Sequence, residues 1–201
     1  MKFYVRQAVF PFFYMIFVSL MSFFISLINI LWVREILYLL SLSVYFFIIG
    51  ASFFQRGQEA IKTRETNDME RREIIRTGED RPLKLDEEYQ PWKGFFIGFI
   101  VTWPLIFLML LHFILTLVTN GTFLFFGGAA NVVYLAFYAP YSVLVLIDGA
   151  IISAWHYFFV LYAVPVIICL AGVCYILGAK KQQREIDKIE DTKKSIYGDK
   201  K

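Results

Sequence analysis

A charged stretch between two long apolar regions limits this chain more than any other feature of its sequence. Residues 55–93 carry nine Lys and Arg side chains and a similar number of carboxylates, whereas residues 8–54 and 94–178 hold few charges. The chain as a whole is 58% hydrophobic, against about 45–50% for an ordinary globular protein. Apolar runs of this length suit a bilayer rather than a soluble core. We therefore expect an all-α polytopic membrane protein in which residues 55–93 form a loop in the cytoplasm.

Four apolar segments are long enough, or nearly so, to cross a bilayer, which takes about 20 helical residues. They pair into two helical hairpins, one on each side of the charged stretch. The first segment exceeds the length of a secretory signal and lacks a cleavage site, so we expect it to stay, with Pro11 in its first turn. The four segments are residues 8–30, 36–54, 94–118 and 158–178. The expected organisation is an N-terminal hairpin (1–54), a charged loop (55–93), a C-terminal membrane region (94–178) and a basic tail (179–201).

Residues 122–153 form a fifth apolar segment, interrupted by Gly127-Gly128, Pro140 and Asp148-Gly149. Lys and Arg collect on the cytoplasmic side of membrane proteins. The N-terminus, the charged loop and the tail all fall on that side only if this segment crosses an even number of times or not at all. Two crossings would leave about 16 residues each, fewer than a span needs. We therefore expect a re-entrant or interfacial segment, with a fifth span as the alternative, in the plasma membrane.

The charged loop contains the pattern of a short exposed helix. Asn67 and Glu70 have capping-box spacing, Asp68 and Arg72 are spaced for an i,i+4 ion pair, and Gly78 suits the position beyond a helix C-terminus. We expect a helix that begins after Asn67 and ends before Gly78. A mixed charge run is commonly a solvated surface, and the alternative is a face that docks a partner protein. The residues proposed for that face are Arg71, Arg72 and Arg76.

Polar residues recur at helical spacing on the first two apolar segments. Small hydroxyl side chains let membrane helices approach closely and bond across their interface. We interpret the two stripes as helix-packing seams, and the alternative is a polar conduit between the helices. One stripe consists of Ser19, Ser22, Ser26 and Asn29, and the other of Tyr38, Ser41, Tyr45 and Ser52.

A further polar face would form within residues 122–153 if they were helical. Phenol and carboxylate groups at that spacing could line a cavity for a small polar or cationic solute. Alternatively, the tyrosines lie at headgroup level on an interfacial helix, and Asp148 belongs to a surface turn. A lone histidine in the third span, His112, is expected to make a buried hydrogen bond, with a ligand or proton-relay role as the alternative. The face consists of Asn131, Tyr134, Tyr138, Tyr141 and Asp148.

No complete signature of a membrane enzyme is present, and no motif for a cofactor or metal is visible. Cys169 and Cys174 lie five positions apart in an apolar run, where we expect them to act as small core residues. A net charge of +3, without interleaved aromatics, gives no indication of nucleic-acid binding. We therefore expect a non-enzymatic accessory or scaffold subunit, in contact with the lipid bilayer, that binds a protein partner through the loop and tail. A small transporter or solute-binding component is the alternative, and a membrane-embedded enzyme comes third.

Overall fold

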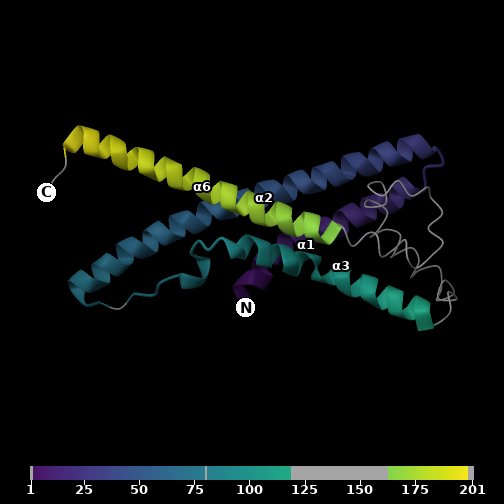
Figure 1. The fold of residues 1–201 in the computed structure, drawn as a ribbon, viewed down its shortest axis with the longest axis horizontal. Helices are drawn as coiled ribbons and strands as arrows, with labels where there is room; N and C mark the ends of the chain where they lie inside the picture. The colour runs from purple at the N-terminus through teal and green to yellow at the C-terminus, as the bar shows by residue number, and fades with distance from the viewer. Residues whose placement is uncertain (1, 80, 119–162, 199–201) are drawn as a thin grey trace.

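A computed structural model describes residues 2–79, 81–118 and 163–198 of the chain. All regular secondary structure in these ranges is helical (Figure 1). The fifth apolar segment, residues 122–153, lies outside the described ranges. The helices are α1 (Lys2–Ser26), α2 (Leu31–Thr77), the short 3-10 helix η1 (Leu85–Glu87), α3 (Trp92–Val118) and α6 (Ala163–Tyr197).

Two of these helices, α2 and α6, are much longer than a bilayer is thick. α2 has 47 residues and α6 has 35, which correspond to lengths of about 70 Å and about 50 Å. The hydrocarbon core of a bilayer is about 30 Å thick. The C-terminal charges begin at Arg56 in α2 and at Lys180 in α6, after long apolar runs. Each helix therefore extends a charged half beyond any membrane that contains its apolar half.

Three described helices are long and apolar enough to cross a membrane, within Phe3–Ser22, Trp32–Thr77 and Val164–Ile196. Large apolar side chains on their outer faces, such as Phe13 and Phe47, are 62% and 76% exposed. Exposed apolar surface of this kind marks contact with lipid or another protein. The helices thus indicate membrane association. The expected four or more spans are not confirmed among the described residues, although α3 is helical over the third expected span.

α2 and α6 cross where the sequence of each changes from apolar to charged (Figure 1). Glycines lie at the point of closest approach between the two helices. A Cβ atom on Gly57 would overlap the carbonyl oxygen of Tyr175, and one on Gly178 would overlap the carbonyl oxygen of Phe54. Residues without a side chain let two helix backbones approach this closely. The two long helices are therefore joined backbone to backbone at one point.

α3 packs along α6 through a second pair of glycines. A Cβ on Gly94 would lie 2.6 Å from the Tyr175 Cβ, and one on Gly98 would lie 3.0 Å from the Ala171 Cβ. The spacing of Gly94 and Gly98 is the GxxxG pattern of close-packed membrane helices. α1 lies against both α2 and α3. The buried core of this assembly includes Met15, Tyr45, Phe53, Val101 and Ile167.

The expectation of a separate short helix beginning at Asn67 is wrong. α2 continues without a break from Leu31 to Thr77, because its charged half contains no proline and is rich in Glu, Arg and Lys, which favour helix. Asn67 consequently lies in a helix interior rather than at an N-terminus. The expected C-terminus is confirmed: Gly78 has a φ of 72°, and its N–H donates to the Ile74 carbonyl oxygen at 2.8 Å.

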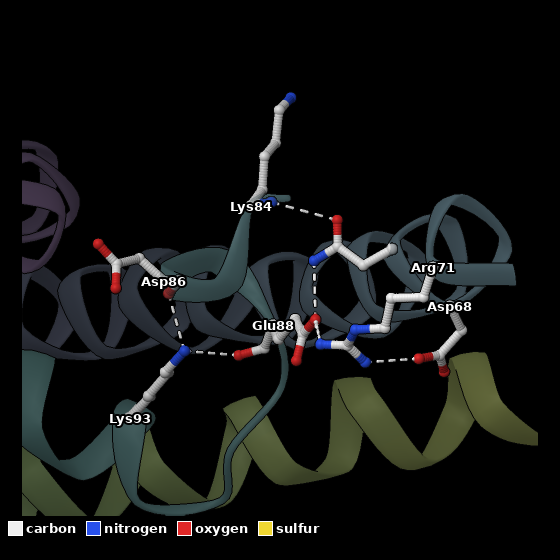
Figure 2. Close-up of polar contacts among 7 residues, drawn as sticks. Asp68, Arg71, Lys84, Asp86, Glu88 and Lys93 are labelled. Atoms are coloured by element: carbon white, nitrogen blue, oxygen red, sulfur yellow. Dashed lines mark hydrogen bonds and ion pairs between the residues drawn. The ribbon is translucent and has the colours of Figure 1, made fainter. Parts of the chain in front are cut away.

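Two smaller expectations are also corrected. α1 begins at Lys2, so Pro11 lies inside the helix rather than in its first turn, because residues 2–10 are helical as well. Asp68 pairs with Arg71 instead of Arg72, with 2.7 Å between Oδ1 and Nη1. The i,i+3 pair forms because Arg71 points to the side of α2 along which the chain folds back (Figure 2).

Candidate functional site

The chain that follows α2 folds back along it. Residues 81–91, here called the return segment, connect α2 to α3 and are held by side chains of α2 (Figure 2). Asn67 is only 2% exposed. Its Nδ2 donates to Glu88 Oε1 at 2.8 Å, and its Oδ1 accepts from the Lys84 backbone N–H at 3.2 Å. Both ends of this buried amide are therefore bound by the return segment.

Arg71 lies one turn further along α2 and strengthens the same contact. Its Nη2 lies 2.6 Å from Glu88 Oε1, and its Nη1 lies 2.7 Å from Asp68 Oδ1. One oxygen of Glu88 thus accepts from both Asn67 and Arg71. A single partly exposed ion pair stabilises a fold little, but here it joins a buried hydrogen-bond network. The network fixes the return segment against α2.

Lys93, near the start of α3, binds the other end of the return segment. The residue is 3% exposed, and its Nζ donates to the backbone carbonyl oxygens of Asp86 and Glu88, both at 2.7 Å. Burial lowers the pKa of the Lys93 ammonium, and the nearby Asp86 and Glu88 carboxylates oppose this only in part. Tyr89 of the return segment also stacks on Tyr175 of α6, with 5.5 Å between ring centroids. The segment is therefore anchored to α2, α3 and α6.

A groove of about 540 Å³ lies between the charged halves of α2 and α6, whose C-terminal ends diverge in Figure 1. It is here called the α2–α6 groove. Three apolar side chains line it, and charges of both signs surround them. The lining residues are Ile61, Arg64, Glu65, Asp68, Met69, Arg72, Gln183, Ile186 and Glu190. This is a concave, amphipathic surface outside the apolar halves of the helices.

The three arginines proposed for partner docking occupy different positions. Arg71 is engaged with Asp68 and Glu88, so it serves the fold of the return segment. Arg72 is exposed and lines the α2–α6 groove. Arg76 is exposed in the last turn of α2. Of the three, Arg72 alone contributes to the groove.

The polar stripe proposed for the first span is divided between buried and exposed positions. Ser22 is fully buried, but its hydroxyl donates to the Val18 carbonyl oxygen of its own helix at 2.7 Å. Asn29 is exposed in the turn between α1 and α2. The side chains of Ser19 and Ser26 lie outside what the structure describes.

In the second stripe the tyrosines, rather than the serines, reach the interior. Tyr38 and Tyr45 are buried, whereas Ser41 and Ser52 are partly buried. The close approaches between helices are made by glycines that the sequence reasoning did not use. The GxxxG spacing of Gly94 and Gly98 in the sequence could have indicated one of these close approaches, the one between α3 and α6.

The residues proposed to bind a solute lie beyond the described ranges. They are Asn131, Tyr134, Tyr138, Tyr141 and Asp148. His112 lies in α3, but the placement of its side chain is outside the description. The solute-binding alternative therefore stays a prediction.

In the described part of the chain, no group of three or more His, Cys, Asp or Glu side chains could hold a metal ion. Cys169 and Cys174 are both free; Cys169 is exposed and Cys174 is partly buried, so the expectation of a core residue is wrong for Cys169. No protein-family model matches the chain, and no curated protein or solved structure matches it.

Proposed function

We propose that this protein is a non-enzymatic scaffold or accessory subunit of a membrane complex that binds a helix of a partner protein in the α2–α6 groove. The observation that carries the proposal is the unbroken continuation of two apolar helices into charged halves that diverge (Figure 1). The glycine crossing holds the two halves at one point. A cleft between preformed helices needs little ordering when a partner binds, which favours affinity.

The lining of the groove favours an amphipathic helix as the partner. The exposed Met69 and the partly buried Ile186 offer apolar surface to the apolar face of such a helix, with the buried Ile61 beneath them. Met69 is 57% exposed, and methionine is a flexible side chain that adapts to different contact surfaces. The surrounding charges include Arg72 of α2 and Glu190 of α6. Complementary charges on the flanks of the partner helix would fix its orientation.

The proposed location of this groove is the cytoplasm. Side chains from the charged halves of α2 and α6 line one groove, which supports the proposal that the loop and the tail share a side of the membrane. This supports an even number of crossings within residues 94–178. The many Lys and Arg residues of both regions then favour the cytoplasmic side. The partner would be a cytoplasmic protein or the cytoplasmic domain of another membrane protein.

Two exposed apolar residues of α2 provide a matched test. Met69 lines the groove, whereas Ile75, 84% exposed, lies outside it. Met69→Lys should remove the partner from the purified complex, because it places a charge on the apolar surface of the groove, and Ile75→Lys should retain it. A photo-activated crosslinker at position 69 should capture a discrete partner, and one at position 75 should not. Equal partner yield from both lysine variants, or equal crosslinking from both positions, would refute docking in the groove.

A further inference from the structure

A small pocket lies where α1, α2, α3 and α6 meet. Its volume is about 60 Å³, room for a few water molecules or one tetrahedral oxyanion, because a single water needs about 10–15 Å³. It is here called the four-helix pocket, and it shares no lining residue with the α2–α6 groove. The polar side chains of its wall include Gln7, Arg56, Thr63 and Lys93.

The guanidinium of Arg56 has a buried N–H donor that lacks an acceptor within the described ranges. Its guanidinium carbon lies 5.1 Å from the centroid of the Phe53 ring. Its Nη1 is buried and has no hydrogen-bond acceptor among the described residues. Arg56 also forms no ion pair in the described part of the chain. Because a buried charged donor without an acceptor is unfavourable, an acceptor from a ligand would stabilise this arrangement.

Lys93 brings a second buried cation to the same pocket. Its two short hydrogen bonds go to neutral backbone carbonyl oxygens, which satisfy N–H groups without cancelling the charge. An ammonium group has three N–H donors, so one remains beyond those two bonds. Within the described ranges Lys93 has no carboxylate at ion-pair distance. The pocket therefore holds two cations that are not neutralised by direct pairing.

The acidic residues that line the pocket are exposed to solvent. Glu59 and Glu87 also line it, but both are exposed, whereas Lys93 is buried and Arg56 is partly buried. Exposed carboxylates are hydrated and screened, so they compensate buried charge poorly. Arg56 and Lys93 are therefore the less exposed charged residues of the pocket, and Glu59 and Glu87 are the more exposed ones.

The surroundings of the pocket are typical of the headgroup layer of a membrane. Tyr4 of α1 contacts the rings of Trp92 and Phe96 of α3, with centroids 5.9 Å and 5.3 Å apart. Aromatic clusters of this kind collect at the boundary between hydrocarbon and water. An adjoining groove of about 560 Å³ adds Arg6 and Lys84, together with Asp86. An aromatic cluster at that boundary would bring the pocket to the depth of the lipid phosphate groups.

We propose that the four-helix pocket binds a phosphate group, held by the guanidinium of Arg56 and the ammonium of Lys93. A guanidinium matches the geometry of phosphate oxygens with two parallel hydrogen bonds. Basic pockets between membrane helices commonly receive lipid headgroups. The phosphate can come from the headgroup of an anionic lipid or from free inorganic phosphate. The site is independent of partner binding in the α2–α6 groove.

Arg56→Gln tests this site, because it removes the charge while keeping a polar side chain. The full chain would be purified in neutral detergent, and its melting temperature measured with added inorganic phosphate, phosphatidic acid or phosphatidylcholine. We expect phosphate or phosphatidic acid to raise the melting temperature of the wild-type protein, and phosphatidylcholine to have no such effect. Arg56→Gln should bind at least about tenfold more weakly, because a charge-assisted hydrogen bond is lost. The matched control is Arg76→Gln, which changes an exposed arginine of the same helix outside the pocket.

The outcomes separate the two sources of phosphate from non-specific attraction. A response to phosphatidic acid alone assigns the site to a lipid headgroup, and a response to inorganic phosphate alone assigns it to a soluble ligand. Equal weakening by Arg76→Gln would show general charge attraction and overturn the proposal. The absence of any response in the wild-type protein would also overturn it, and this measurement stands even if Arg56→Gln does not fold.

Discussion

Gly57 of α2 and Gly178 of α6 each lie against the backbone of the other helix. Gly57 faces the Tyr175 carbonyl oxygen, and Gly178 faces the Phe54 carbonyl oxygen, at distances that leave no room for a Cβ atom. Both glycines lie within two residues of the first charge that follows the apolar run of their helix. The contact therefore sets how the two charged halves diverge, and with them the shape of the α2–α6 groove.

Alanine at this crossing should destabilise the protein. Gly57→Ala and Gly178→Ala each place a methyl group on a backbone carbonyl oxygen that cannot move aside. Because the methyl group meets backbone rather than a side chain, we expect a cost at or above the upper end of the usual range of about 1–3 kcal/mol in the free energy of unfolding. That cost exceeds the gain of about 1 kcal/mol from better helix propensity. Thermal unfolding in detergent would measure the loss.

Gly50→Ala on the same helix is the control. The nearest atom to a Cβ at this position is the Cys174 Sγ at 3.3 Å, which belongs to a side chain. This variant should be neutral or slightly more stable than the wild-type protein. Equal melting temperatures for all three alanine variants would contradict the close crossing.

Loss of the Asn67 amide should release the return segment. Asn67→Ala leaves the Lys84 N–H and one interaction of Glu88 without their partner, at a cost of about 1–3 kcal/mol. We expect faster trypsin cleavage after Lys84 than in the wild-type protein. Thr66→Ala is the matched control, because the Thr66 hydroxyl donates to a carbonyl oxygen of its own helix. Identical cleavage rates in the two variants would show that the amide does not hold the segment.

Lys93 should make stability depend on pH in the alkaline range. Burial lowers the pKa of Lys93 in the folded protein below its ordinary value of 10.5. Between the lowered pKa and 10.5, the unfolded chain binds a proton that the folded chain has lost. The contribution of Lys93 to stability therefore rises with pH over this window and is smallest below it. The neutral amine retains two N–H groups, enough for the carbonyl oxygens of Asp86 and Glu88.

The variant Lys93→Arg isolates this effect, because arginine stays protonated in the same range. The difference in melting temperature between the wild-type protein and Lys93→Arg should shift in favour of the wild-type protein as pH rises towards 10.5. Taking the difference cancels the titration of other groups. A difference that does not change with pH would mean that the pKa of Lys93 is not lowered.

Single cysteines should place the charged halves of α2 and α6 on one side of the membrane. In a background without Cys169 and Cys174, cysteines at exposed positions 75 and 193 should resist an impermeant thiol reagent in intact cells and react after lysis. A cysteine at position 29, in the turn between α1 and α2, should react in intact cells. If position 193 reacts in intact cells while position 75 does not, the two charged halves lie on opposite sides of the membrane. That result would contradict the shared groove.

Several features could be predicted from the sequence because they depend on neighbours along the chain. The length and hydropathy of the apolar runs were sufficient to indicate membrane helices. Gly78 was identified as a helix end because the preference for a positive φ is a property of glycine itself. The capping pattern at Asn67 failed for the opposite reason: the same residue types also bind distant backbone groups.

The contacts of the candidate site were decided by the tertiary structure. Asn67 and Glu88 are 21 positions apart, and Arg71 and Glu88 are 17 apart, so no local pattern links them. The sequence likewise showed the charges of Arg56 and Lys93 but not that both residues line one pocket. That arrangement depends on where α2, α3 and α6 cross, and glycine determines the crossing by allowing backbones to touch. Hydropathy sums along the chain, whereas hydrogen bonds and close packing require particular atoms to meet in space.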